Sequence, residues 1–130
     1  LQAFIGLRAI DKLDGYAKNR NKNFFTYMDN VKTNHLKLRV DETNFISNFA
    51  FPIVNKNKGK IVMELISNDI EVRPLIAGNM AAKPMWTVNH GHISLPNCEM
   101  IDAYGFYLPN HQDLTTAEIL TITNILNKYE

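Results

Sequence analysis

Apolar residues recur at roughly helical spacing along the first 31 residues of the chain. They run from Leu1 to Val31, with charged and amide side chains between them. The pattern predicts one long helix, or two helices with a break near Gly15. A glycine inside a helix costs up to about 1 kcal/mol, so Gly6 and Gly15 indicate either close packing or a break.

Two stretches with a period of two follow. The first predicts a short strand over Leu36–Val40. The second, Phe45–Val54, predicts a longer strand with Pro52 at an edge or at its end. The alternation places one set of side chains on a single face of this second strand: Phe45, Phe49, Phe51 and Ile53.

The next segment reads as a helix between two strands. Asn55 or Asn57 can cap this helix, which is predicted to end near Asn68. A strand over Ile70–Ile76 begins two or three residues later. Strand, helix and strand predict a β-α-β unit, whose two strands pair in parallel with a right-handed crossover in nearly every case.

The last third of the chain begins without a clean period. Glycines and prolines between Ala77 and Asn97 predict a loop with a helical turn. A short helix over 97–104 and a brief strand over 106–108 follow. Thr115 and Glu118 then form a capping box for the final helix. Leu114 and Ile119 can make its hydrophobic staple, and its buried stripe is predicted to contain Ile119, Ile122, Leu126 and Tyr129.

These elements together predict an α/β (α+β) fold. We expect a small two-layer sandwich, with a three- to four-stranded sheet and the helices on one face. With 130 residues, 45% of them hydrophobic, the chain has enough apolar surface for one domain.

Composition excludes several classes of partner. The formal net charge is only +1, so the chain lacks the cationic face that nucleic acid requires. No apolar run approaches the roughly 20 residues needed to span a membrane. Cys98 has no partner for a disulfide within the chain, and no secretory leader is evident, so we expect a cytoplasmic protein. Because Leu1 already lies inside an apolar pattern, we expect a fragment of a longer chain.

Residues that could carry catalysis or bind metal are sparse. His90 and His92 precede Cys98, but their spacing matches no standard zinc site and a second cysteine is missing. No serine lies in a nucleophile elbow, and no glycine-rich phosphate loop is present. We therefore expect no metal and assign no catalytic residue.

One segment, Glu71–Pro84, has the composition of a ligand-binding turn. Arg73 leaves a predicted strand, and Gly78 and Asn79 turn the chain toward a helical turn. A guanidinium suits phosphate or carboxylate, and an amide both donates and accepts hydrogen bonds. The alternative is that this segment is an ordinary loop after a strand, with Arg73 on the surface and no ligand-binding role.

Four ordered stretches resemble a known family. They are the opening run 1–7 with Leu13, Asp14 and Arg20 downstream, the segment 47–53, the segment 70–79, and the segment 105–111 followed by Leu114 and Thr115. Their order and spacing resemble the C-terminal domain of the DegT/DnrJ/EryC1/StrS aminotransferases. Within that family they are most similar to the perosamine-synthase and nucleotide-sugar 3-dehydratase branches.

The resemblance implies a cofactor that lies outside this chain. In the family, a large N-terminal domain holds pyridoxal phosphate, and its lysine forms the Schiff base or is replaced by histidine in the dehydratases. Residues 1–31 would be the linking helix or helices, and 32–130 the small domain of a fold-type I enzyme. None of the lysines here matches the Schiff-base motif, so we expect neither cofactor binding nor activity from the chain alone.

The resemblance also implies where substrate would lie. Arg73, Gly78, Asn79 and Lys83 occupy the motif near the nucleotide-sugar substrate, although the basic residue Lys83 is displaced by one position from the family pattern. Tyr107, Asn110 and His111 match a second motif that could line the cleft, and packing of the last strand would explain them nearly as well. The family arrangement implies a homodimer.

The leading hypothesis is thus the small domain of an aminotransferase for a nucleotide-linked keto-deoxysugar, with glutamate as amino donor. The alternatives are a small domain of a nucleotide-sugar 3-dehydratase and a free-standing binding domain of the same fold. Loss of a large domain would expose apolar side chains on the first helix, which allows self-association through a patch formed by Phe4, Ile5, Phe24 and Phe25.

Overall fold

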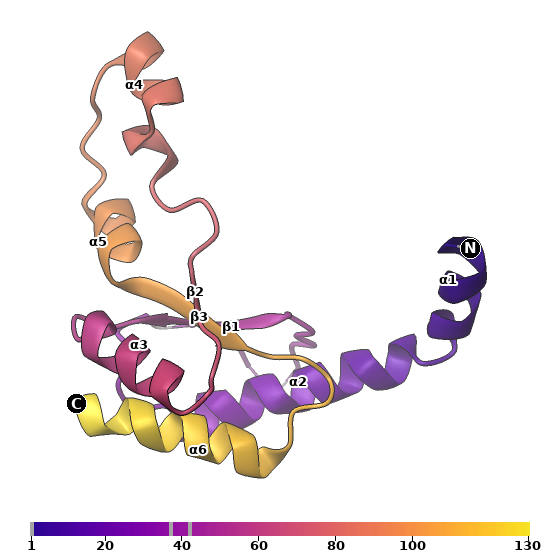
Figure 1. The fold of residues 1–130 in the computed structure, drawn as a ribbon. Helices are drawn as coiled ribbons and strands as arrows, with labels where there is room; N and C mark the ends of the chain where they lie inside the picture. Colours follow the sequence, from indigo (N-terminus) through magenta and orange to yellow (C-terminus); the bar gives the residue numbers. More distant parts are fainter. Residues whose placement is uncertain (1, 37, 42) are drawn as a thin grey trace.

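The computed structural model describes residues 2–36, 38–41 and 43–130, and it contains one small sheet whose core-forming helices lie on one side of it. Figure 1 shows α2 and α6 lying side by side beneath the sheet, with α3 next to α6. The helices and strands, in chain order, are α1 (Gln2–Ile10), α2 (Leu13–Asn30), β1 (Ala50–Val54), α3 (Lys58–Ser67), β2 (Arg73–Pro74), the 3-10 helix η1 (Met80–Ala82), α4 (Pro84–His90), α5 (Pro96–Tyr104), β3 (Gly105–Pro109), α6 (Thr116–Leu126) and the 3-10 helix η2 (Asn127–Tyr129). The predicted fold class is confirmed.

The order of the strands differs from the expected β-α-β pair. β3 lies in the centre and pairs antiparallel with both β1 and β2. β1 and β2 therefore run in the same direction, but β3 separates them, so the predicted parallel pairing is wrong. β2 is also shorter than the expected strand over 70–76. Pro74 has no backbone N–H to donate to a ladder, which limits β2 to two residues.

No strand forms over Leu36–Val40 in the part of this stretch that the structure describes; Lys37 lies outside it. Instead, the side chain of Asn34 forms hydrogen bonds with the backbone of β1. Its Nδ2 donates to the Pro52 carbonyl at 3.0 Å, and its Oδ1 accepts from the Val54 amide at 3.0 Å. The His35 amide adds a bond to the Val54 carbonyl at 2.9 Å. The side-chain amide thus satisfies backbone groups of β1 that a neighbouring strand would otherwise bond.

The N-terminal helical region is divided at Asp11–Lys12, so the break near Gly15 was predicted at the wrong place. Close packing does not explain the two glycines either, because a Cβ at Gly6 or Gly15 would meet no atom within 4 Å. α1 has no buried residue, whereas the second half of α2 buries Phe24 and Tyr27 in the core. The expected exposure therefore holds for Phe4 and Ile5 but is wrong for Phe24, and Phe25 is half-buried.

The core lies between the sheet and the three covering helices. The inward face of β1 carries Phe51 and Ile53, and that of β3 carries Phe106 and Leu108. Phe45 and Phe49, predicted for the same face as Phe51, are exposed because β1 begins only at Ala50. The core also takes side chains from every covering helix: Phe24, Tyr27, Ile61, Leu65, Ile119, Ile122, Ile125 and Leu126.

The start of α6 follows the sequence closely. Thr115 and Glu118 form the predicted capping box of α6, in which the Glu118 amide donates to Thr115 Oγ1 and the Thr115 amide donates to Glu118 Oε2. Ile119, Ile122 and Leu126 form the buried stripe, as predicted. Tyr129 is only half-buried. Asn57 precedes α3 without a side-chain capping bond, and Asn55 Oδ1 accepts from the Asn57 amide at 2.7 Å.

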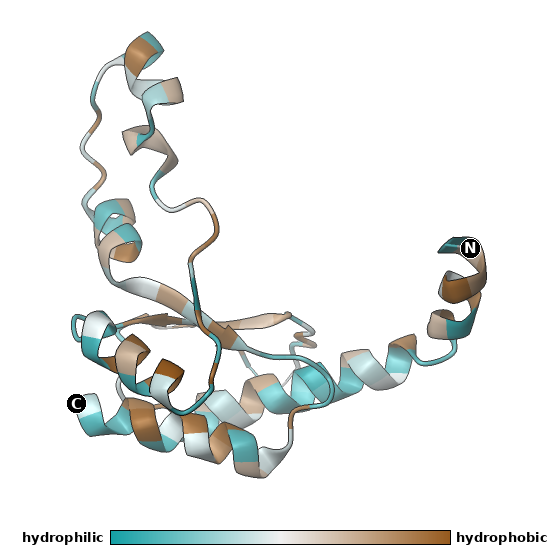
Figure 2. Ribbon diagram, in the orientation of Figure 1, coloured by the Kyte–Doolittle hydropathy of each residue, from teal (hydrophilic) through white to brown (hydrophobic). Residues whose placement is uncertain are grey.

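An arm formed by residues 75–104 rises from the side of the sheet that the helices leave open (Figure 1). It contains η1, α4 and α5, so the predicted loop over 77–97 includes a short helix as well as the expected helical turn. Among residues 75–104 only Asn79 is buried. Figure 2 shows hydrophobic positions on this arm and on α1 as well as between the sheet and α6.

Candidate functional site

Strand pairing places Arg73 beside Tyr107. The two residues are direct partners in the β2–β3 ladder, and opposite residues of an antiparallel pair project from the same face. That face is the one opposite the core, because Leu108 points inward and side chains alternate along β3. Two of the predicted site residues are therefore brought together on the open face of the sheet.

Arg73 is exposed and forms an ion pair with Glu71. Its Nε donates to Glu71 Oε1 at 2.9 Å, and its Nη2 donates to the same oxygen. Both side chains are mostly solvent-accessible, so the pair contributes little to stability. The guanidinium of Arg73 therefore remains accessible to solvent while it is paired with Glu71.

Two shallow pockets adjoin Tyr107 on this open face. The first, the apolar groove, has a volume of about 280 Å³ and is lined by Asn48, Phe49, Ala50, Pro52, Leu75, Ile76 and Tyr107. The second, the Arg73 pocket, has a volume of about 210 Å³ and is lined by Phe49, Glu71, Arg73, Tyr107 and Pro109. Phe49 and Tyr107 line both, so the apolar groove and the Arg73 pocket adjoin.

The other residues of the first motif lie on the arm. Gly78 has a φ of 59°, a backbone conformation that favours glycine. A Cβ at this position would also lie 1.8 Å from Asp102 Oδ1, so a side chain would clash there. Asn79 is buried, and its side chain accepts from the Ala81 amide at 3.1 Å, which caps η1. Lys83 lies between η1 and α4, and its carbonyl accepts from the Trp86 amide at 2.9 Å.

The second motif divides between three environments. Tyr107 is on the open face, Asn110 is fully buried, and His111 is exposed. Asn110 Nδ2 donates to the carbonyls of Asn48 at 2.8 Å and Arg20 at 3.2 Å, which makes it a bridge between segments. His111 Nδ1 accepts from the Asp113 amide at 3.2 Å.

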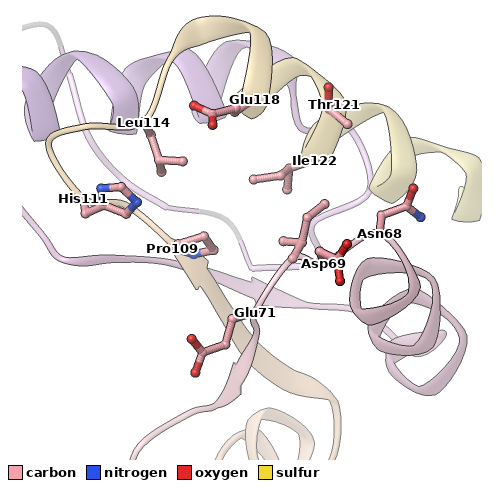
Figure 3. Close-up of a pocket in the computed structure, with 10 residues that line it drawn as sticks. Asn68, Asp69, Glu71, Pro109, His111, Leu114, Glu118, Thr121 and Ile122 are labelled. Atoms are coloured by element: carbon pink, nitrogen blue, oxygen red, sulfur yellow. The ribbon is translucent and has the colours of Figure 1, made fainter.

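A further pocket lies elsewhere, between α6, the end of β3 and the turn after α3 (Figure 3). Its volume is about 450 Å³, and His111 is the one predicted site residue that lines it. Three carboxylates at its rim were not predicted as a group: Asp69, Glu71 and Glu118. Hydrogen bonds from Thr115 lower the pKa of Glu118, with a smaller contribution from the nearby His111. Since Glu118 serves the capping box and Glu71 pairs with Arg73, two of these carboxylates already have structural partners.

Neither metal ligation nor membrane insertion is evident in the described parts of the chain. Over residues 2–36, 38–41 and 43–130, no group of three or more His, Cys, Asp or Glu side chains is placed to hold a metal ion. None of the helices in these ranges is long and apolar enough to cross a membrane.

Comparison with known proteins identifies the family. The sequence profile of the DegT/DnrJ/EryC1/StrS aminotransferase family matches residues 1–127. This chain belongs to the DegT/DnrJ/EryC1/StrS aminotransferase family. The resemblance predicted from the four sequence stretches is thereby confirmed.

Two curated proteins are similar to most of the chain. A GDP-4-keto-6-deoxy-D-mannose 3-dehydratase of Yersinia pseudotuberculosis is 28% identical over 95% of this chain and 34% of its own length. The same enzyme of Escherichia coli O55:H7 (strain CB9615 / EPEC) is 32% identical over 83% of this chain and 30% of its own length. The chain thus spans about a third of the length of these relatives.

Solved structures agree with the fold. A crystal structure of GDP-4-keto-6-deoxymannose-3-dehydratase with a trapped PLP-glutamate geminal diamine superposes with a TM-score of 0.76, at 26% identity over 94% of this chain and 34% of that one. The sugar aminotransferase CalS13 from Micromonospora echinospora gives a TM-score of 0.80 at 13% identity, over 95% of this chain and 33% of that one, which shows the shared fold alone. Two other structures similar to this chain, both of GDP-4-keto-6-deoxymannose-3-dehydratase, contain hydrated PLP in one case and GDP-perosamine in the other.

Proposed function

We propose that this chain is the small domain of a pyridoxal-phosphate-dependent aminotransferase that acts on a nucleotide-linked keto-deoxysugar. Residues 1–31 would link it to a large domain, and residues 32–130 would form the small domain itself. The observation that carries the proposal is the family match over residues 1–127 in a chain that spans a third of its relatives. The exposed apolar residues of α1 and of the arm support it, since such surface usually has a partner.

The cofactor would be held outside this chain. A Schiff-base lysine needs an amine that is removed from water, and every lysine the structure describes is exposed or half-buried. When bound, pyridoxal phosphate supplies the electron sink for exchanging a keto group and an amine. We expect the 130-residue chain to retain no bound cofactor, and so no visible absorbance, once free pyridoxal phosphate has been removed from the mixture. An absorbance band of an internal aldimine would contradict this division of roles.

Dehydration at C3 of the sugar is the second candidate activity, and the names of the curated relatives favour it. Both curated relatives are GDP-4-keto-6-deoxy-D-mannose 3-dehydratases, although the family takes its name from aminotransferases. The residue at the Schiff-base position of the full coding sequence would discriminate between the two activities. A lysine would indicate transamination, and a histidine would indicate dehydration. An assay with GDP-4-keto-6-deoxymannose and glutamate would then give an aminosugar or a 3-deoxysugar. A stop codon and a start codon directly before Leu1 would instead favour a free-standing binding domain.

Within such an enzyme, the substrate would contact the open face of the sheet and the arm. Arg73 would bind a phosphate, Gly78, Asn79 and Lys83 would lie near the sugar, and Tyr107, Asn110 and His111 would be the cleft candidates. The proximity of Arg73 and Tyr107 on the open face supports this placement, whereas the burial of Asn110 favours a structural role for that residue.

The Arg73 contact can be tested in the longer enzyme. Arg73→Ala is expected to raise KM for the nucleotide sugar at least tenfold, because a charged hydrogen bond to phosphate contributes about 1.5–3 kcal/mol. The absorbance of bound cofactor should not change. Arg39→Ala, at another exposed arginine, is the matched control. Unchanged kinetics in Arg73→Ala would remove Arg73 from the site.

A homodimer in the cytoplasm is part of the same proposal. The apolar side chains of α1 that face solvent, including Phe4, Ile5 and Leu7, would be covered in the complete assembly. In the isolated chain they would promote self-association. Light scattering that gives a monomer mass at all concentrations would contradict this expectation.

A further inference from the structure

The start of α2 projects from the body of the domain. Every residue from Gln2 to Gly15 is exposed, and the buried residues of α2 are Asn23, Phe24 and Tyr27. Figure 1 shows α1 and the first turns of α2 extending beyond the sheet and α6. Burial therefore fixes the position of α2 over its second half alone.

Three asparagines lie within five positions of α2, where this projecting part begins. Asn19, Asn21 and Asn23 are unfavourable there, because asparagine forms helices less readily than alanine. Gly15 weakens the same stretch further. Residues 13–23 are thus a poor helix former by themselves, so contacts with other segments must support the helix here.

Two of these asparagines form short hydrogen bonds to the backbone of neighbouring loops. Asn21 Oδ1 accepts from the Ile46 amide at 2.6 Å, in the segment that precedes β1. Asn23 Nδ2 donates to the His111 carbonyl at 3.0 Å, in the loop between β3 and α6. The side chains that weaken the helix therefore join it to two loops that are distant from it in sequence.

Arg20 reaches both loops at once. Its Nε donates to Ser47 Oγ at 2.9 Å, and its Nη1 makes a longer contact with Gln112 Oε1 at 3.5 Å. Asn19 Nδ2 adds a bond to the Gln112 carbonyl at 3.3 Å. The two side-chain partners of this half-buried guanidinium carry no charge, so its planar fork of donors, and not an ion pair, explains the contact. We call the four side chains of α2 that contact these loops the collar: Asn19, Arg20, Asn21 and Asn23.

The collar constrains α2 in a way that apolar packing does not. Hydrogen bonds are directional, whereas burial of apolar surface is not, so bonds to two loops oppose both tilt and rotation of the helix. The Asn23 side chain is buried, which makes its hydrogen bonds costly to leave unmade. Leu13 lies seven residues before Arg20, or about 10 Å along the helix axis, so a tilt of about 6° would move Leu13 by about 1 Å.

We propose that the collar fixes the direction in which α2 leaves the small domain, with Arg20 as its principal positioning residue. The inference rests on the proposed function for its purpose, since residues 1–31 would link this domain to a large one. In that enzyme the collar would hold the open face of the sheet in place relative to the cofactor. A displacement of about 1 Å at a reacting centre can lower the rate about a hundredfold.

Residual dipolar couplings of the 130-residue chain measure this direction as the angle between the axis of residues 13–18 and the axis of α6. The collar variant combines Arg20→Met with Asn21→Ala. The control variant combines Lys18→Met with Lys22→Ala, at two exposed positions of the same helix. We expect the angle to change by about 10° or more in the collar variant, which is about 2 Å at the start of α2, and by less than about 3° in the control. An equal angle in all three chains would overturn the proposal, because the stiffness of α2 would then be sufficient.

Hydrogen exchange separates the collar from helix propensity. Alanine forms helices better than asparagine, so propensity alone predicts that Asn21→Ala slows amide exchange over residues 17–20 by about threefold. Loss of the hydrogen bond to Ile46 predicts the opposite, with exchange about threefold faster or more. Slower exchange in Asn21→Ala would refute the collar. Unchanged methyl shifts in the core verify that this variant folds.

Kinetics of the longer enzyme test the positioning role of Arg20. We expect the collar variant to lower kcat about tenfold or more, while KM for the nucleotide sugar changes by less than about threefold, because the substrate contacts themselves remain. The absorbance of bound cofactor should not change. A purely structural role would instead lower Tm and leave kcat of the folded enzyme equal to that of the control variant, and this result would overturn the positioning role.

The angle and the reaction can fail separately. A changed angle in the collar variant, together with a longer enzyme that catalyses neither amine transfer nor dehydration, would refute the assigned reaction and leave the collar in place. Conversely, an active enzyme whose kcat is the same in the collar and control variants, together with an unchanged angle, would refute the collar alone.

Discussion

The buried amide of Asn110 bridges three segments that are distant in sequence. Its Nδ2 donates to the carbonyl of Asn48 before β1 and to the carbonyl of Arg20 in α2, at 2.8 and 3.2 Å. Its backbone amide donates to the Phe49 carbonyl at 3.0 Å. Asn110→Ala removes the two side-chain hydrogen bonds and keeps the backbone hydrogen bond. The variant therefore isolates what the side-chain amide contributes to stability.

The expected loss in the free energy of unfolding is about 2 kcal/mol. Two hydrogen bonds at about 1 kcal/mol each give about 2 kcal/mol, and lost packing around a fully buried side chain adds about 1 kcal/mol. Removal of Oδ1 returns about 1 kcal/mol, since that atom is the one buried side-chain polar atom without a partner in the described parts of the chain. Asn110→Asp should cost more, because it would place a carboxylate against two carbonyl oxygens.

Urea denaturation followed by circular dichroism measures this difference. Asn124→Ala, at an exposed position of α6, is the control and should change stability by less than about 0.5 kcal/mol. The loss in Asn110→Asp should shrink at low pH, where protonation of the carboxyl restores a donor. A change below about 0.5 kcal/mol in Asn110→Ala would refute the bridging role and return Asn110 to the list of cleft residues.

Two further predictions concern the C-terminal end and the arm. Glu64 accepts hydrogen bonds from Lys128 and Tyr129, which hold the pKa of this carboxyl below its ordinary value. Because the folded pKa is depressed, the stabilisation is present above the unfolded pKa and is lost as pH falls through the folded pKa. Glu64→Gln should therefore lower Tm at pH 7, and its Tm should converge with that of the unchanged chain as the pH falls through the lowered pKa of Glu64. A Tm difference independent of pH would contradict this. Gly78→Ala should destabilise the arm by about 1 kcal/mol through its positive φ, with an added steric part that Asp102→Ala relieves. Hydrogen exchange of the arm amides in a double-mutant cycle measures both the backbone cost and the steric cost. Full rescue of protection by Asp102→Ala would show that the positive φ adds no cost.

Local interactions explain which features could be predicted from sequence. The capping box of α6 and its buried stripe involve residues within a few positions of one another, so the pattern alone located them. The inward pair Phe51 and Ile53 follows from alternation within β1. The family motifs were recognisable for a related reason, because each is a short contiguous run.

The positions of the site residues depended on contacts between segments far apart in sequence. Nothing in the local pattern indicates that β3 inserts between β1 and β2, since that order follows from how the whole core is buried. The insertion places Arg73 opposite Tyr107 and leaves Phe49 beside Tyr107 on the open face. Likewise, Asn110 stands in a motif that suits a ligand contact, and its burial, which the tertiary structure alone shows, favours a structural role.

The sequence by itself therefore determined the family, the fold class and the capping box of α6, while the tertiary structure decided which side chains share a surface. The physical reason is the range of the interactions. Periodicity and capping act over one or two turns of chain, whereas strand order and side-chain grouping depend on burying residues contributed by segments up to about 100 positions apart, such as Asn30 and Asn127.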